Sequence, residues 1–285
     1  MPRFEVPDVD LSQYSMRQLA APPLVVLVVA LAIIGGWTAT TGSPVSPGIE
    51  FTGGSELIAE SDASQSEVRQ AFETDPVTIR QVGTSGDQYL VTFQTEEVPD
   101  IRDGSDVTID VVQSQSVTAT FGSSTQELAL FGVAGAFLGM SVLVFALFRT
   151  FVPSIAVVVS AFSDIVVPLA LMNVLDIKLS LGTVAALLML IGYSVDSDIL
   201  LNNHVLRRSG SFWESVERAM KTGVTMTVTS IAAMAVMTVV SYVFGIQLMT
   251  AIGVVLVMGL TTDLMNTYML NVTLLRWYKF EGVNR

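Results

Sequence analysis

The sequence predicts a membrane α-helical bundle of six transmembrane helices, with a small extracytoplasmic α+β domain between helices 1 and 2. The composition is the first observation: mean hydropathy is +0.60, and 51% of the 285 residues are hydrophobic while only 14% are charged. Such a surface cannot be kept wet in a soluble domain of this length. Six apolar runs long enough to cross a hydrocarbon core of about 30 Å are the second observation. The third is one polar, acidic segment after the first run.

The apolar runs divide the chain into four parts. Residues 1–21 form a polar tail, and residues 22–41 form an uncharged first span. A retained helix is favoured over a signal peptide here, because the run is long and the segment before it is neither short nor strongly basic. Residues 42–124 form the external domain, and residues 125–285 carry the other five spans. We expect those spans at residues 128–148, 152–175, 179–205, 224–244 and 248–275.

The external domain carries fourteen acidic and three basic residues, a net charge of −11. This charge disfavours binding to nucleic acid or to anionic lipid head groups. It fits adaptation to a salty medium, or a domain dedicated to binding cations. Alternating apolar residues and turn signals predict a βαββ-type α+β sandwich. Its expected elements are a strand at 55–60, a helix at 63–73, a hairpin of strands 77–82 and 89–93, and a last strand at 107–112.

Basic residues give the orientation in the cell membrane. Almost all bases near the spans fall on one side if both termini are cytoplasmic, whereas the short loops opposite contain only Lys178. The positive-inside rule therefore predicts cytoplasmic termini and an extracytoplasmic acidic domain in a multi-pass plasma-membrane protein. Residues 209–222 have apolar side chains roughly on one face, which predicts an amphipathic interfacial helix on the cytoplasmic surface.

Four aspartates fall inside the predicted spans: Asp164, Asp196, Asp198 and Asp263. An ionised aspartate at the centre of a lipid-facing helix costs about 2.5–3.5 kcal/mol. No lysine or arginine of the chain lies at comparable depth. The carboxylates are therefore protonated, bound to a cation, exposed to a water-filled crevice, or paired with an arginine of a partner chain. They are candidates for an ion pathway, the alternative being inert polar contacts between helices.

Helical spacing assigns the polar residues of the fourth span to two faces. One stripe contains Gly192, Asp196 and Asn203, and a roughly opposite stripe contains Ser194, Asp198 and Asn202. The two aspartates therefore face different neighbours. In the fifth span, Thr225 and Thr229 recur at helical spacing. They either bond back to carbonyls of their own helix or present a polar stripe to the aspartates.

The residue inventory argues against an enzyme. The chain has no cysteine, which excludes disulfides, thiolate metal sites and thiol nucleophiles, and it has one histidine. A zinc site would have to be built mainly from carboxylates. We expect no catalytic residues, no metal and no cofactor.

Three stretches of the chain carry a resemblance to a known family. The first is Gly48-Ile-Glu-Phe-Thr-Gly-Gly54, and the others are the pair Ser163-Asp164 and the segment Ile191-Gly-Tyr-Ser194. Together they resemble the SecF family of accessory subunits of the Sec protein-export machinery, whose G-I-D-F-T-G-G signature is similar to the first stretch. The motif residues are Gly48, Glu50, Phe51, Gly53, Gly54, Gly192 and Tyr193. The acidic composition resembles the archaeal, salt-loving members.

The resemblance implies a fold of the RND superfamily, a SecD partner chain and a place beside the Sec translocon, in contact with membrane lipid and with the secreted or inserting polypeptide. It implies assistance to protein export or membrane insertion, coupled to a proton or sodium gradient. Gly192-x-x-x-Asp196 fits the superfamily's G-x-x-x-D pattern, which makes Asp196 the first candidate. Bacterial members have Asn-Asp-Thr where this chain has Asp196-Ser197-Asp198, an arginine near the place of Thr225, and usually a glycine at the place of Asp263.

Two other functions are compatible with the same layout. One is half of an RND-type transporter of small molecules or lipids, and the other is a passive scaffold for SecD. The short external domain and the 8% aromatic content favour export over a transporter with an aromatic-lined substrate vestibule.

Overall fold

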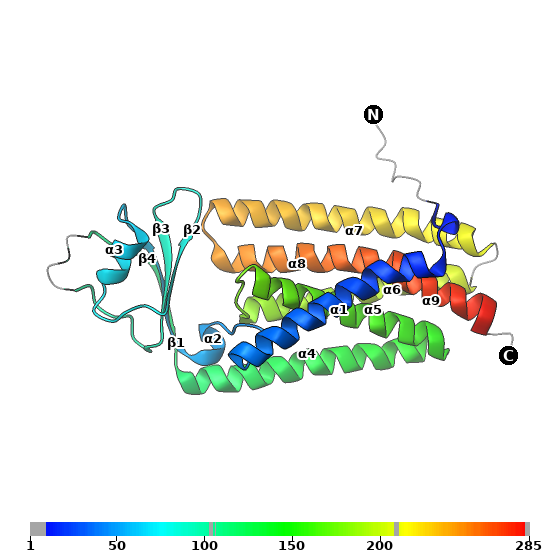
Figure 1. The fold of residues 1–285 in the computed structure, drawn as a ribbon, viewed down its shortest axis with the longest axis horizontal. Helices are drawn as coiled ribbons and strands as arrows, with labels where there is room; N and C mark the ends of the chain where they lie inside the picture. The colour runs from blue at the N-terminus through cyan, green and yellow to red at the C-terminus, as the bar shows by residue number, and fades with distance from the viewer. Residues whose placement is uncertain (1–9, 103–104, 106, 208–210, 283–285) are drawn as a thin grey trace, which may run out of the picture.

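The computed structural model describes residues 10–102, 105, 107–207 and 211–282, and it confirms the predicted fold class. A bundle of long helices lies at one end, and a small sheet domain at the other (Figure 1). The long helices are α1 (Met16–Thr41), α4 (Ala119–Phe148), α5 (Phe151–Val174), α6 (Leu181–Arg207), α7 (Phe212–Val243) and α8 (Gln247–Met265). The domain contains α2 (Ile49–Thr52), β1 (Gly54–Glu60), α3 (Gln65–Gln70), β2 (Thr78–Val82), β3 (Gln88–Phe93) and β4 (Asp110–Val117).

Six described helices are long and apolar enough to span a membrane, the last of them continuing from α8 to Gly282. Helix α5 is the central one. In its most apolar stretch 67% of the residues are buried, against 11% for α4 and for α7. It packs against α1, α4, α6 and α8. A polar side chain on α5 is consequently surrounded by protein, whereas much of α4 and α7 is left for lipid or a partner.

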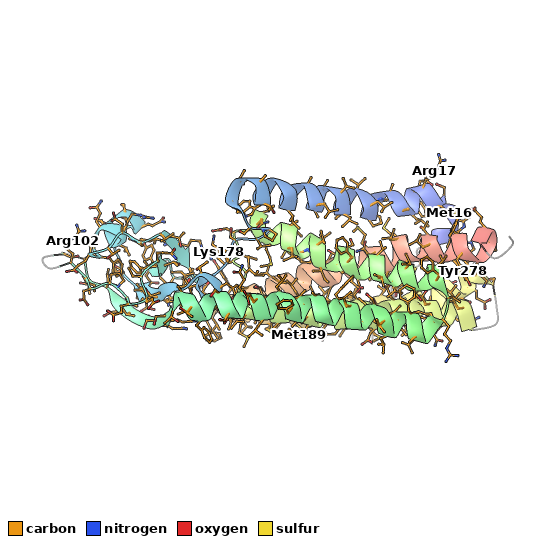
Figure 2. All side chains as sticks on the ribbon, turned by 90° about the horizontal axis from the view of Figure 1, so that it is seen from below. Met16, Arg17, Arg102, Lys178, Met189 and Tyr278 are labelled. Atoms are coloured by element: carbon orange, nitrogen blue, oxygen red, sulfur yellow. The ribbon has the colours of Figure 1, made fainter. Side chains whose placement is uncertain are left out.

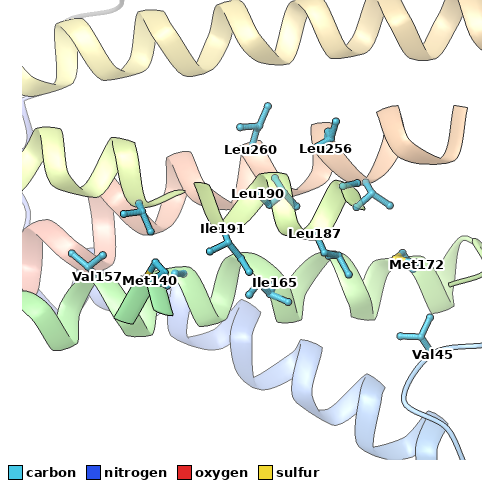
Figure 3. Packing of buried hydrophobic residues seen from close by; sticks show 14 of the residues in the cluster. Val45, Met140, Val157, Ile165, Met172, Leu187, Leu190, Ile191, Leu256 and Leu260 are labelled. Carbon is cyan, nitrogen blue, oxygen red and sulfur yellow. The ribbon is translucent and has the colours of Figure 1, made fainter. Parts of the chain in front are cut away.

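The core of the bundle is a layer of aliphatic side chains between α5, α6 and α8 (Figure 3). Leu190 of α6 is 1% exposed and lies beside Gly259 of α8. A Cβ atom at residue 259 would overlap the Leu190 side chain, so the two helices approach this closely only because residue 259 is glycine. This close approach brings the polar residues of α6 and α8 within reach of one another.

The segment 209–222, for which the sequence predicts a separate amphipathic helix, differs from that prediction. From Phe212 onward it is the first part of α7 and not a separate helix, while residues 209 and 210 lie outside the described part. The physical reason is its apolar face. Phe212, Val216 and Ala219 are buried in one cluster with side chains of α6 and α9 (Val272–Trp277) and with Tyr268, which lies between α8 and α9. That face packs on protein, so it has no need of the lipid surface.

The last span is not a uniform α-helix. Helix α8 ends at Met265, and the π-helical segment Asn266–Asn271 joins it to α9. A second π-helical segment, Tyr278–Gly282, follows. Such i→i+5 segments are rare and occur frequently at functional sites. The segment Asn266–Asn271 carries three side chains that contact aspartates of the bundle.

The domain is a four-stranded antiparallel sheet in the order β2-β3-β1-β4 with α3 on one face. Val68 and Phe72 pack there against Leu57, Val91 and Phe93. The last strand is Asp110–Val117 and not residues 107–112. Its register is fixed by pairing with β1, and every residue before Val117 is exposed. A strand without a buried face has no apolar alternation to predict its position.

The motif 48–54 docks the domain on the bundle. The Gly48 amide donates to the Leu179 carbonyl at 2.7 Å, and the Leu179 amide donates to the Ser46 carbonyl at 2.8 Å. Gly53 has φ +77, and a Cβ there would lie 2.6 Å from Ala119 Cα. Figure 2 shows Lys178 near this junction, with Arg102 in the domain and Arg17 and Tyr278 at the opposite end of the bundle. The glycines of the motif are required by close backbone contact.

Candidate functional site

Three carboxyl groups meet inside the bundle. Asp164 of α5 is 1% exposed, Asp198 of α6 is 0% exposed and Asp263 of α8 is 2% exposed. Each comes from a different helix around the aliphatic core, and each is held by hydroxyl or amide donors. We call these three side chains the aspartate cluster.

Asp164 accepts two hydrogen bonds. The Ser194 hydroxyl on α6 donates to Oδ2 at 2.6 Å, and the Asn266 side-chain amide donates to Oδ1 at 2.6 Å. Both donors are buried. Asp164 therefore links α5 to α6 and to the π-helical segment.

A bridging hydroxyl joins the other two carboxyl groups. Thr267 Oγ1 lies 3.0 Å from Asp198 Oδ1 and 3.3 Å from Asp263 Oδ1. Asn271 donates its side-chain amide to Asp198 Oδ1 at 2.8 Å, and Ser197 donates to Asp263 Oδ1 at 2.8 Å. A hydroxyl has one hydrogen, so Thr267 can donate to only one carboxylate at a time. The second contact is a hydrogen bond only when a carboxyl group of the pair carries a proton.

The π-helical segment aligns these donors. Four residues of an α-helix turn through about 400°, so a stripe of every fourth residue drifts by about 40° at each step. The wider i→i+5 turn reduces this drift, and it keeps Asp263, Thr267 and Asn271 on the side that faces α6. Local helix geometry thus brings Thr267 and Asn271 to the same oxygen of Asp198.

No basic side chain neutralises the aspartate cluster within the described part of the chain. The four ion pairs found there join partly exposed side chains at the surface. Carboxyl groups buried without a base are expensive to ionise. The arrangement can take up a proton or a small cation and share it among oxygens of three helices.

The predicted site residues of the bundle differ in where the structure places them. The structure brings four of them together, namely Asp164, Ser194, Asp198 and Asp263. Asn202 is buried one turn beyond Asp198. The others lie on exposed surface of the bundle, namely Gly192, Tyr193, Asp196, Asn203, Thr225 and Thr229. Asp196 is therefore separate from the aspartate cluster, on the opposite stripe of α6 as helical spacing predicts.

The threonines of α7 bond to their own helix. Thr225 Oγ1 donates to the Lys221 carbonyl and Thr229 Oγ1 donates to the Thr225 carbonyl, each at 2.7 Å. This is the first of the two predicted arrangements, and it removes the need for a polar partner.

Sequence reasoning missed four members of the site: Ser197, Asn266, Thr267 and Asn271. The signal was present in the last span, where Asp263, Thr267 and Asn271 recur every four residues. A count of polar residues at helical spacing would have found this stripe. Ser197 could not be found in that way, because it lies between the two stripes of α6 and reaches α8 only in the folded bundle.

The motif residues Glu50 and Phe51 lie at the junction with the domain and away from the aspartate cluster. Burial raises the pKa of Glu50, and the nearby charge of Glu56 raises it further. Burial also raises the pKa of Glu56, against the lowering effects of a hydrogen bond from Thr92 and the charge of Arg80. Phe51 is 3% exposed. At this junction, Glu50 of the motif and Glu56 of β1 are thus two neighbouring carboxyl groups whose pKa values are raised by burial.

Comparisons with known proteins agree with one another. The family model described as "Protein export membrane protein SecD/SecF, C-terminal" matches residues 98–281. The chain is 65% identical to the protein-export membrane protein SecF of Haloferax volcanii over 100% of both chains. It is 38% identical to SecF of Pyrococcus furiosus, over 93% of both chains.

A solved structure shares the fold. The crystal structure of SecDF, a translocon-associated membrane protein from Thermus thermophilus, superposes with a TM-score of 0.66 at 18% identity over 93% of this chain. The match spans 38% of that longer chain. Together with the full-length SecF relatives, these findings show that the chain belongs to the SecF branch of the SecD/SecF family of protein-export membrane proteins.

Proposed function

We propose that the chain acts with a SecD-type partner beside the Sec translocon to assist protein export or membrane insertion, and that an ion crosses through the aspartate cluster to drive this work. One observation carries the proposal: Asp164, Asp198 and Asp263 are buried on three helices without a basic partner among the described residues, and Asp198 and Asp263 share the Thr267 hydroxyl. A bundle that needed only polar contacts could use serine or asparagine alone at lower desolvation cost.

The partner covers the face of α6 that carries Asp196. This aspartate is exposed on the bundle, and nothing lies within 4 Å of a Cβ built on Gly192 one turn before it. An ionisable side chain cannot face lipid there without a large cost. A polar or basic side chain of a SecD-type helix binds the Asp196 carboxylate, and the small Gly192 allows that helix to approach closely. Asp196 is thus the contribution of this chain to the interface.

The acidic domain lies outside the cell, where it meets the emerging polypeptide. Edge strand β4 supports this contact because no described strand pairs with its outer edge, and because it exposes Val111 and Val112, at 51% and 58%. An extended segment can add to such an edge through main-chain hydrogen bonds. The absence of native cysteine allows a clean test of orientation. Asp75→Cys should react with a membrane-impermeant maleimide in intact cells, and Glu217→Cys should react only after lysis; the reverse pattern would invert the topology.

Secretion in cells tests the proposed function. We expect Asp164→Asn, Asp198→Asn and Asp263→Asn, introduced into Haloferax volcanii lacking its own SecF, to slow export of a secreted reporter several-fold at an unchanged membrane level of the protein. Asp75→Asn, an exposed aspartate of the domain, serves as the matched control.

The alternatives predict other results. A passive scaffold tolerates all three substitutions without a secretion defect. A transporter of small molecules or lipids shows normal secretion but loses resistance to toxic compounds when the gene is deleted. Either result would replace the proposed function.

A further inference from the structure

A cleft opens on the surface of the bundle between the start of α1 and the end of α9. Its volume is about 460 Å³. Three residues of each helix line it, namely Met16, Arg17 and Ala20 of α1 and Thr273, Leu274 and Trp277 of α9. Figure 2 shows Met16 and Arg17 at the end of the bundle opposite the sheet domain. None of these residues contacts the aspartate cluster, so the cleft is a separate feature of the molecule.

Two hydrogen-bond donors line this cleft without a partner in the part of the chain that the structure describes. The Arg17 guanidinium is in none of the ion pairs found there, and the Trp277 side chain, 42% exposed, makes no hydrogen bond there. Arg276 differs, because it lies 5.1 Å from the centre of the Trp213 ring. No acid lines the cleft. A fixed positive charge beside an indole N–H is a site for an anionic acceptor.

An apolar surface continues from the cleft along α1. Ala20, Leu24 and Val28 follow Arg17 at spacings of three and four residues, so all four side chains lie on one stripe of the helix. Leu24 is 44% exposed and Val28 is 64% exposed. A ligand that fits both parts has an anionic head and a hydrocarbon tail. Phospholipids have this form, and basic pockets between membrane helices bind their anionic head groups.

We propose that the cleft between α1 and α9 binds one anionic phospholipid. Arg17 and Trp277 donate to its phosphate group, and its hydrocarbon chains lie along Leu24 and Val28. A tryptophan at this level is typical of the membrane–water interface, where lipid phosphates lie. The bound lipid joins the first span to the last one. The inference is independent of the proposed function, since it involves no residue of the aspartate cluster.

Quenching of tryptophan fluorescence in lipid nanodiscs tests the site. Trp37→Phe and Trp213→Phe together leave Trp277 as the only tryptophan of the full chain. Bromine atoms on a lipid chain quench a tryptophan that the chain contacts. We expect brominated phosphatidylglycerol, diluted into phosphatidylcholine, to quench Trp277 beyond its share of the lipid, with a binding preference of about tenfold from the charged hydrogen bond. Brominated phosphatidylcholine, diluted into phosphatidylglycerol, should quench less than its share.

Variants and a competitor identify the ligand. Arg17→Gln should remove the preference for phosphatidylglycerol. Arg149→Gln should retain it, because this exposed arginine follows α4 at the same end of the bundle but does not line the cleft (Figure 1). Millimolar inorganic phosphate should not restore the fluorescence, because it lacks the hydrocarbon chains. Circular dichroism and gel filtration establish that each variant is folded.

Three results would overturn the site. Quenching of the folded parent in proportion to lipid share would show that no lipid is selected. An undiminished preference in Arg17→Gln would remove the arginine as the head-group ligand. Recovery of fluorescence on addition of inorganic phosphate would assign the cleft to a free anion and not to a lipid.

Discussion

Thr267 is the residue whose single hydrogen is shared between two buried acids. Its position follows from the π-helical segment, and its hydroxyl contacts both Asp198 and Asp263. Threonine keeps the methyl group packed while offering one donor, whereas a larger polar side chain would not fit among fully buried neighbours.

We predict that Thr267→Val destabilises the protein by about 1–3 kcal/mol, because an isosteric methyl removes the hydroxyl that contacts two buried carboxyl oxygens and leaves each with one donor, from Asn271 or Ser197. Thr267→Ser should retain most of the stability. The measurement is thermal unfolding of the purified chain in detergent. Thr229→Val is the matched control, because the Thr229 hydroxyl is exposed and donates to a carbonyl of its own helix. An unchanged unfolding midpoint for Thr267→Val would show that the Thr267 hydroxyl does not contribute to the stability of the fold.

Glu50 and Glu56 form a second pair of acids, outside the membrane spans. Burial raises the pKa of both above the ordinary 4.5, and the charge of Glu56 adds to the effect on Glu50. The folded protein then binds protons more readily than the unfolded chain. Since stability follows the difference in bound protons, their contribution is most favourable below pH 4.5 and is lost as pH rises through the folded-state pKa.

We therefore predict that Glu56→Gln stabilises the domain at neutral pH and flattens this part of its pH dependence. Hydrogen exchange of β1 amides, compared at mildly acidic and neutral pH, measures the effect. Glu73→Gln, an exposed acid of the same domain, should leave the profile unchanged. Greater protection of parental β1 at neutral than at acidic pH would contradict the predicted sign.

Among the elements, α4 connects the domain to the bundle. Its first turns lie against the motif, so that a Cβ at Gly122 would be 2.9 Å from the Gly53 amide nitrogen. Farther along, a Cβ at Gly132 would have nothing within 4 Å. The two glycines lie on the same helix, but only Gly122 contacts the motif. A comparison of the same substitution at both residues therefore isolates the effect of that contact.

We predict that Gly122→Ala destabilises the protein by about 1–3 kcal/mol through forced overpacking. Gly132→Ala should instead be neutral, or stabilising by up to about 1 kcal/mol, since alanine favours the helix. Thermal midpoints of the two variants decide the matter. Equal midpoints would mean that the motif does not hold α4 in place.

The sequence predicts elements well where composition alone determines them. Six spans follow from uninterrupted apolar runs, and the opposite placement of Asp196 and Asp198 follows from helical spacing. The sequence predicts elements poorly where tertiary contacts determine their position or geometry. Strand β4 has no apolar alternation, the amphipathic start of α7 finds a protein surface, and the π-helical segment has no sequence signal. The contact of Thr267 with two acids therefore requires the folded bundle.

At the scale of the whole molecule, the domain and the bundle are tied at defined points. Arg80 of β2 donates to the Asp176 carbonyl at 2.8 Å, and Asn173 donates to the Pro44 carbonyl at 2.8 Å. The end of α5 and the loop between α5 and α6 thus contact the segment after α1, through Asn173 and Leu179, and the loop also contacts the sheet through Asp176. Asp164 and Asp198 lie on the two helices that flank this loop.

The central claim is that the three aspartates act as one unit. The most direct test compares reporter secretion in Haloferax volcanii carrying Asp263→Asn alone with secretion in the strain carrying Asn at residues 164, 198 and 263 together. Groups that act as a unit show non-additive losses. We predict that the single substitution slows secretion nearly as much as the triple one, at equal membrane levels of protein. A single variant that secretes normally, or a triple variant that secretes far more slowly than the single one, would contradict the account.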